Sequence, residues 1–171
     1  MDGQRDSHLP EGTVMDPWGS HIPVLMAAAS HTKGAVIELG CGDYSTPALH
    51  LVCKGRMLVS AEEDSGWLSR FCDLADDTHK LFYVENNNWE GFAPIDWTWD
   101  VAFVDHAPVG RRKVDIARLR DKTRFVVIHD TECPAYEYEP VLATFRYRVD
   151  YKRGGPWTSV VSNLEPISFL G

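Results

Sequence analysis

The chain has 171 residues, 44% of them hydrophobic, which is enough for one domain around one core. Its 17 lysines and arginines are outnumbered by 25 aspartates and glutamates, and the formal net charge is −8. Binding to phosphate backbones needs the opposite sign of charge, so we expect no nucleic-acid partner. No apolar run reaches the ~18 residues of a membrane helix, and the sequence begins without an export signal. These features predict a soluble, cytoplasmic protein with no membrane partner.

The beginning of the chain has no hydrophobic period. Residues 1–19 carry Gly, Pro, Asp and Ser with isolated apolar positions, which predicts a flexible arm or lid. A single domain is expected over residues 20–171. Its first helix is predicted to begin at an N-cap, Ser20, with Pro23 in the first turn, and to end near Gly34.

Five short apolar runs follow, at residues 35–39, 57–61, 81–84, 101–104 and 125–128. Apolar residues at successive positions are typical of strands that are buried on both faces of a parallel sheet. Segments of helical length lie between the runs, at residues 46–54, 65–75 and 111–121. This alternation predicts an α/β fold with an open, doubly wound sheet.

The end of the chain departs from that alternation. After a helix near residues 137–144, two strand-like segments, 147–152 and 159–162, are separated by Arg-Gly-Gly-Pro, which predicts a hairpin. The expected architecture is therefore Rossmann-like, with a mostly parallel seven-stranded sheet and a C-terminal antiparallel hairpin.

Two glycines follow the first strand directly, where nucleotide-binding loops lie in such folds. Gly40 and Gly42 lack a Cβ, so the backbone there can turn sharply and approach a ligand closely. A diphosphate cradle usually has a third glycine, which is missing here, so a diphosphate ligand is the weaker interpretation. The alternative is a plain tight turn.

An acidic residue ends the second strand. Glu62 lies 20 positions after Gly42, the interval at which a strand-end carboxylate reaches the hydroxyls of a ribose. Glu62 or its neighbour Glu63 would accept both hydrogen bonds. In the alternative interpretation, these acids only begin the next helix, where they favour the positive end of its dipole.

These residues resemble the class I S-adenosylmethionine-dependent methyltransferases over roughly residues 36–162. Residues 38–42, Glu-Leu-Gly-Cys-Gly, resemble the first motif of that family, Glu62 matches its ribose-binding acid, and the terminal hairpin matches its sheet edge. Residues 59–64 and 99–105 resemble the small-molecule O-methyltransferase branch. The resemblance implies methyl transfer from S-adenosyl-L-methionine to an oxygen of a small-molecule acceptor.

The same resemblance implies roles for individual residues. The glycine loop would contact the amino-acid half of the cofactor, Asn86 would bond the adenine, and Trp89 would stack on it or meet its edge. An Asn-rich turn with a core tryptophan is the alternative for that segment. The implied cofactor-binding residues are Glu38, Gly40, Cys41, Gly42, Ser45, Glu62, Glu63, Asn86, Trp89 and Asp105.

Two aspartates end neighbouring strands. Asp105 and Asp130 are expected about 5 Å apart if their strands pair, and carboxylates so close share a proton, pair with a base or bind a cation. The surrounding sequence resembles the Mg²⁺ site of catechol O-methyltransferase-like enzymes. It departs from that pattern at Thr131, which replaces an amide and leaves Glu132 as a substitute ligand, and at Pro108, which replaces a lysine.

Three interpretations of this region stay open. In the first, Asp105, Asp130 and Glu132 bind Mg²⁺, which acidifies the acceptor hydroxyl. In the second, no metal is needed, Asp105 lies near the cofactor, and His106 or His129 is the general base. In the third, the two aspartates only cap turns.

Other features stay open in the same way. The cations at residues 111–113 either receive an acidic group of the substrate or form a solvated helix face, and His21 lines the substrate mouth or packs in the core. Two other functions compete with methyl transfer: a noncatalytic cofactor- or partner-binding protein, and a nicotinamide-dependent oxidoreductase. A homo-oligomer is compatible with the sequence.

Overall fold

The computed structural model describes residues 17–153 and 155–170, which form a seven-stranded sheet with the order β3-β2-β1-β4-β5-β7-β6. Strands β1 to β5 are parallel, whereas β7 runs antiparallel to both β5 and β6. The predicted fold class is confirmed, including the terminal hairpin. The strands are β1 (Val36–Leu39), β2 (Leu58–Glu62), β3 (His79–Tyr83), β4 (Trp99–Val104), β5 (Thr123–His129), β6 (Tyr147–Tyr151) and β7 (Thr158–Ser162).

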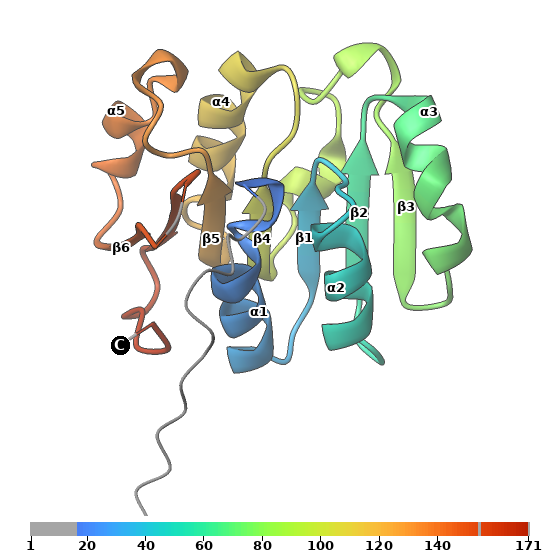
Figure 1. Cartoon of the computed structure of the whole chain (residues 1–171), viewed down its shortest axis with the longest axis horizontal. Helices are drawn as coiled ribbons and strands as arrows, with labels where there is room; N and C mark the ends of the chain where they lie inside the picture. Colours follow the sequence, from blue (N-terminus) through green and yellow to red (C-terminus); the bar gives the residue numbers. More distant parts are fainter. Residues whose placement is uncertain (1–16, 154, 171) are drawn as a thin grey trace, which may run out of the picture.

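Helices cover both faces of the sheet (Figure 1). On one face lie α1 (Ile22–His31) and α2 (Ser45–Val52), and on the other lie α4 (Val109–Leu119) and the short α5 (Glu139–Leu142). Helix α3 (Ser65–Leu68) continues into the 3-10 helix η2 (Ser69–Leu74) beside α2. The remaining 3-10 turns are η1 (Pro17–Gly19), η3 (Glu85–Asn87), η4 (Ala93–Asp96) and η5 (Pro134–Tyr136).

The sheet separates two hydrophobic cores. Successive residues of a strand point to opposite faces, so β4 contributes Val101 and Phe103 to the core under α1 and α2, and Ala102 and Val104 to the core under α4. All four side chains are fully buried. This double burial explains why the central strands are apolar at successive positions.

Local details differ from the sequence-based expectations. The first helix has no side-chain cap, because the Ser20 hydroxyl donates to the carbonyl of Pro156 instead. Asp64 is a side-chain cap, accepting from the amide of Trp67. The helix expected at residues 65–75 becomes a 3-10 helix after Leu68. Most of the expected arm at residues 1–19 lies outside the residues that the structure describes. Among the described residues, no helix is long and apolar enough to cross a membrane.

Gly40 is the point where the loop after β1 packs on the backbone that follows β4. Its φ is +93°, and a Cβ there would lie 2.7 Å from backbone atoms of Asp105 and His106. The chain's own backbone therefore requires a glycine at this position. Gly55 has a similar φ of +83°, but a Cβ there would meet nothing within 4 Å.

These two glycines make a matched pair for a test of stability. Gly40→Ala and Gly55→Ala both place a side chain at positive φ, at about 1 kcal/mol. Only Gly40→Ala adds a clash with backbone, so we expect it to lower the free energy of unfolding by about 2 kcal/mol more. Urea denaturation of the two variants measures this difference, and equal losses would contradict the packing described for Gly40.

Candidate functional site

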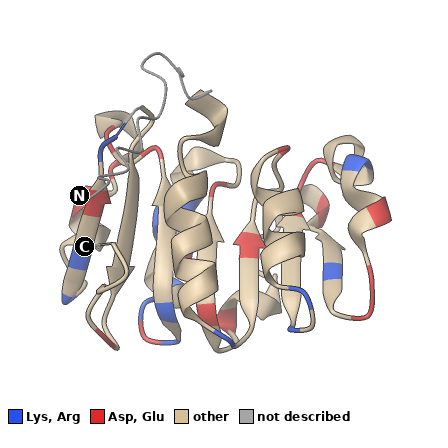
Figure 2. Ribbon diagram, turned by 60° about the horizontal axis from the view of Figure 1, so that its bottom comes forward, with Lys and Arg blue, Asp and Glu red and all other residues tan. Residues whose placement is uncertain are grey.

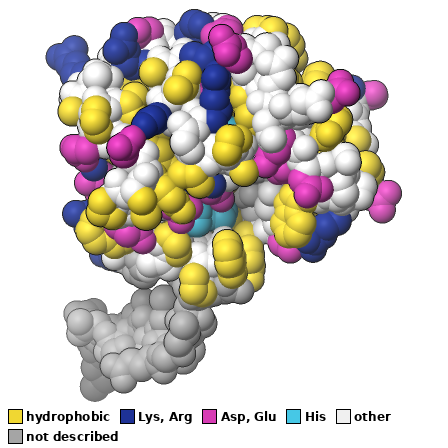
Figure 3. Space-filling view, turned by 90° about the horizontal axis from the view of Figure 1, so that it is seen from above, with side chains coloured by type: hydrophobic (Ala, Val, Ile, Leu, Met, Phe, Trp, Pro, Cys, Tyr) yellow, Lys and Arg dark blue, Asp and Glu magenta, His cyan; other side chains and the backbone are white. Residues whose placement is uncertain are grey.

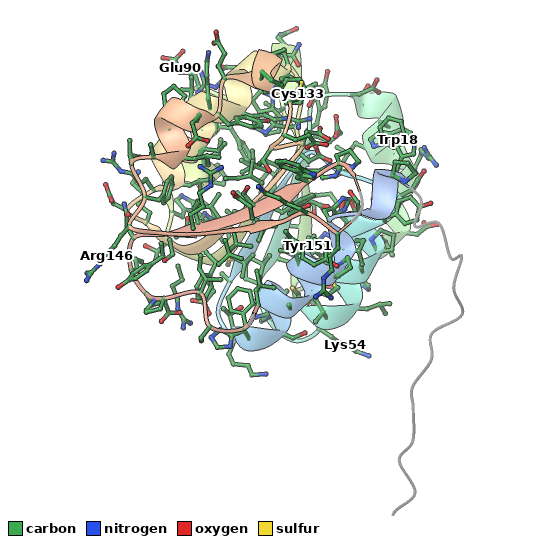
Figure 4. All side chains as sticks on the ribbon, turned by 60° about the vertical axis from the view of Figure 1, so that its left-hand side comes forward. Trp18, Lys54, Glu90, Cys133, Arg146 and Tyr151 are labelled. Atoms are coloured by element: carbon green, nitrogen blue, oxygen red, sulfur yellow. The ribbon has the colours of Figure 1, made fainter. Side chains whose placement is uncertain are left out.

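The carboxyl ends of the parallel strands meet at one edge of the sheet, the upper edge in Figure 1. Seen from above, histidine side chains lie at the bottom of a depression among acidic and hydrophobic ones (Figure 3). Trp18 lies toward this edge, whereas Lys54, beyond the end of α2, lies toward the opposite one (Figure 4).

Several hollows lie along this edge, and three of them lie beside the predicted site residues. The β1 hollow, of about 470 Å³, and the β5 hollow, of about 330 Å³, share Trp18 and Asp105 and so adjoin. The β2 hollow, of about 480 Å³, is lined by residues that include Glu63, Tyr83 and Asn87. The β1 hollow is lined by residues that include His21, Cys41, Gly42 and Ser45, and the β5 hollow by residues that include Arg112, His129, Asp130 and Tyr136.

Glu62 connects the glycine loop to the end of β2. One carboxylate oxygen, Oε2, accepts the amide of Cys41 at 2.9 Å, and Oε1 accepts the amides of Glu63 at 3.0 Å and Asp64 at 2.9 Å. The loop is also held from its other side, since the indole of Trp67 donates to the carbonyl of Cys41 at 2.7 Å. The loop is thus held from both sides, and Oε2 of Glu62 retains one acceptor site for a further donor.

Glu38 lies beneath the glycine loop, fully buried between β1 and α2. Burial raises its pKa to about 7, although the hydroxyls of Ser45, Ser60 and Thr46 favour the charged form. Glu38 is shielded from solvent, and it does not line the β1 hollow.

In the segment after β3, the expected adenine-binding residues lie apart from one another. Trp89 is 0% exposed, and its indole donates to the carbonyl of Ala107, so it is a core residue, as in the alternative interpretation. Asn86 lines a separate hollow, and its neighbour Asn87 lines the β2 hollow. Both have a φ of +55°, a conformation that asparagine tolerates better than most residues.

His106 lies away from the three hollows. It is 1% exposed, its ring lies 4.2 Å from that of Trp89, and its Nε2 is 3.1 Å from Oδ2 of Asp115. Burial lowers its pKa despite this carboxylate. The structure therefore favours His129 over His106 as the histidine of the site.

A guanidinium lies between the two strand-end aspartates. Arg112 Nη1 is 2.9 Å from Oδ1 of Asp105 and 3.2 Å from Oδ2 of Asp130, and its other nitrogens donate to the carbonyls of Asp105 and His106. The two aspartates are thus brought together as expected. They neither share a proton nor need an added cation to lie close together, because both pair with the basic side chain of Arg112. The sequence analysis offers the cations at residues 111–113 as receivers of an acidic substrate group or as a solvated helix face, and it does not pair Arg112 with the two aspartates. The signal for that pairing is the position of Arg112 in the first turn of the helix that follows β4.

This arrangement does not fit the magnesium site. Arg112 already bonds an oxygen of each aspartate, and Glu132 accepts the backbone amide of Trp157 at 2.8 Å. Mg²⁺ needs several oxygen ligands in near-octahedral geometry, and the three expected ligands each have an oxygen already occupied by a donor of the chain. Asp130 also has a φ of +60°, a strained conformation that is often found at functional sites.

His129 contacts both the aspartates and the start of α1. Its Nδ1 is 3.3 Å from Oδ2 of Asp105, and its Nε2 is 3.1 Å from the hydroxyl of Ser20. Burial lowers the pKa of His129, but the hydrogen bond and charge of Asp105 outweigh that effect and raise it. His21 completes the group, with its ring stacked on Phe103 at 4.8 Å.

No protein-family model matches the sequence, and no curated protein matches it. Solved structures do match. The match with a METTL16 methyltransferase domain covers 91% of this chain and 88% of that domain, with 12% identity and a TM-score of 0.59. The N-methyltransferase NodS of Bradyrhizobium japonicum WM9, in complex with S-adenosyl-L-homocysteine, covers 85% and 86%, with 12% identity and a TM-score of 0.58. The chain therefore has the Rossmann-like methyltransferase fold.

One expectation is overturned by a third match. Methanococcus jannaschii fibrillarin, a pre-rRNA processing protein, covers 91% of this chain and 86% of its own, with 11% identity and a TM-score of 0.57. The exclusion of nucleic-acid partners was therefore wrong, since this fold occurs in a protein that processes RNA. Net charge is a sum over the whole surface and does not report local patches; here basic and acidic residues are interspersed (Figure 2).

The raised pKa of Glu38 predicts a pH dependence of stability. Between pH 4.5 and about 7 the folded chain holds a proton that the unfolded chain has lost, so the free energy of unfolding falls as pH rises. Relative to Glu38→Gln, the wild type should lose up to about 3 kcal/mol over this range. Urea denaturation at several pH values measures the difference, and parallel profiles would contradict the burial of an ionisable group here.

The Arg112 pairing predicts a large effect on stability. Arg112→Met leaves two carboxylates close together without a cation and should cost about 3–5 kcal/mol at neutral pH. A matched control is Arg120→Met, since Arg120 pairs with Asp121 on the surface and should contribute under about 1 kcal/mol. Thermal and urea unfolding of both variants measure the costs. A similar, small loss in the two variants would show that Arg112 does not hold the site together.

Proposed function

We propose that this protein is an S-adenosyl-L-methionine-dependent methyltransferase that acts on an oxygen of a small molecule. The observation that carries the proposal is the junction of the β1 and β5 hollows at Asp105. A donor on the glycine loop would have its reactive end at this junction, directly beside an acceptor in the β5 hollow. Proximity and alignment are most of what methyl transfer requires.

The residues along the edge fit the parts of this cofactor. The rigid loop of Gly40, Cys41 and Gly42, with Ser45, would contact the amino-acid half in the β1 hollow. Glu62 and Glu63 would accept the ribose hydroxyls, because both lie at the end of β2 beside the glycine loop. The β2 hollow, between the ends of β2 and β3, would take the adenine beside Asn87. When bound, the cofactor supplies a methyl group on a positively charged sulfur.

The β5 hollow fits a small acceptor with a hydroxyl group. The acceptor oxygen would form a bond to the methyl carbon while the electron pair of the sulfur–carbon bond stays on sulfur, giving S-adenosylhomocysteine. The acceptor's proton would be held between His129 Nδ1 and Asp105 Oδ2, which are 3.3 Å apart. Arg112 bonds the other carboxylate oxygen of Asp105, Oδ1, and so keeps Oδ2 directed toward His129. The small volume of the hollow favours a small acceptor group.

Calorimetric titration of the purified chain tests cofactor binding. We expect S-adenosylmethionine and S-adenosylhomocysteine to bind and NAD⁺ not to. Glu62→Ala should weaken binding at least ~30-fold, because it removes charge-assisted hydrogen bonds worth about 2 kcal/mol or more. The control Asp77→Ala removes an exposed acid before β3 and should bind normally. Binding of NAD⁺ alone, or of none of the three, would contradict the proposal.

The acceptor class needs a separate assay. Transfer of a labelled methyl group is measured to pools of phenols, to small polyols and to total RNA, with the wild type and with Asp105→Asn. The proposal expects labelled small molecules, and expects the variant to lose most of the activity. Labelling of RNA alone would retain methyl transfer but overturn the small-molecule acceptor.

A further inference from the structure

Three side chains converge where the β1 and β5 hollows meet. His21 from the start of α1, Asp105 from the end of β4 and His129 from the end of β5 each place one nitrogen or oxygen atom within 4.8 Å of the others. His21 faces the β1 hollow, His129 faces the β5 hollow, and Asp105 lines both. This grouping joins residues that lie far apart in the sequence.

The contact between His129 and Asp105 requires a positive species. The Ser20 hydroxyl donates its hydrogen to the carbonyl of Pro156 at 2.8 Å, so its oxygen is left to accept from Nε2 of His129 at 3.1 Å. In a neutral imidazole, the Nδ1 atom then carries a lone pair that faces the carboxylate oxygen at 3.3 Å. Two electron-rich atoms at that distance are held together by a proton or by a metal ion between them.

His21 supplies an independent observation. It is 3% exposed, and within the described part of the chain neither of its ring nitrogens has a hydrogen-bond partner. A buried polar group without a partner costs about 1–3 kcal/mol, so it needs a compensating ligand. Its ligand atom is one of the three in the group with Asp105 and His129.

We propose that His21, Asp105 and His129 bind a divalent transition-metal ion of the zinc type. Two imidazoles and one carboxylate suit zinc, cobalt or iron, whereas Mg²⁺ prefers oxygen ligands. Tetrahedral bonds of about 2.1 Å place ligand atoms about 3.4 Å from one another. The ligand atoms of this group lie within 4.8 Å of one another, so a contraction of at most roughly 1.4 Å completes the site.

The surroundings orient the ligands as metal sites require. Arg112 holds Oδ1 of Asp105 at 2.9 Å, leaving Oδ2 directed toward His129. Ser20 fixes the ring of His129 through the nitrogen that does not bind the ion. Such outer contacts set the tautomer and the direction of metal ligands.

Three protein ligands leave at least one position open, as in catalytic zinc sites. That position adjoins the β5 hollow, where an acceptor hydroxyl could bind the ion and lose its proton more easily. This role rests on the proposed function, whereas the metal site does not. The ion takes the place of the proton between His129 and Asp105.

Cobalt(II) is the probe, because its visible absorption reports both binding and coordination geometry without any assay of activity. The full-length chain, stripped with a chelator, is titrated with cobalt and then with competing zinc. We expect one ion per chain, the absorption of a four- or five-coordinate nitrogen and oxygen site, and displacement by zinc. Absence of absorption at millimolar cobalt would overturn the proposal.

The site is assigned with two variants. His21→Phe keeps an aromatic ring against Phe103 and removes only the ligand nitrogen, so the chain should fold normally and bind cobalt at least 100-fold more weakly. His50→Ala is the control, because His50 and His79 form a second pair with 3.1 Å between their Nδ1 atoms. Unchanged binding in His21→Phe, or loss of binding in His50→Ala, would overturn the assignment.

The metal site and the proposed function can fail separately. S-adenosylhomocysteine binding to the metal-free chain is measured beside the cobalt titration. Cobalt binding without cofactor binding would support the site and contradict the methyltransferase proposal. Cofactor binding without cobalt binding would leave a proton between His129 and Asp105, and would overturn the metal proposal alone.

Discussion

The ion pairs of Arg112 hold the site together. An aspartate directly follows each of two neighbouring parallel strands, and the two carboxylates would repel each other without a cation between them. Arg112 supplies it from the first turn of α4, and also bonds two backbone carbonyls at the end of β4. The junction of the β1 and β5 hollows therefore has a fixed shape, since Asp105 lines both. His129 contacts Asp105 there, and Ser20 contacts His129.

The carboxylate of Glu62 holds the loops in place, as the guanidinium of Arg112 holds the strand ends. Glu62 accepts three backbone amides, two from its own loop and one from Cys41, so the glycine loop is fixed before any ligand binds. Preorganised loops lose little entropy on binding, which favours a site for a small cofactor. With Gly40 packed on the backbone after β4, the loops of β1, β2 and β4 form one rigid rim.

Much of this arrangement could be predicted from sequence, because buried parallel strands are apolar at successive positions and their carboxyl ends meet at one edge. Asp105 and Asp130 were placed together on that ground. Arg112 was not, because three consecutive cations point about 100° apart around a helix: Arg111 pairs with Asp115, Arg112 with the aspartates, and Lys113 with Glu137. Only packing decides which cation turns inward.

The most direct test is a crystal structure of the full-length protein with S-adenosylhomocysteine and cobalt. The account predicts the ribose at Glu62 and Glu63, the sulfur beside Asp105 at the junction of the two hollows, and an anomalous cobalt peak within bonding distance of His21 and His129. Nucleoside density elsewhere on the surface, or a sulfur directed away from Asp105, would contradict the account.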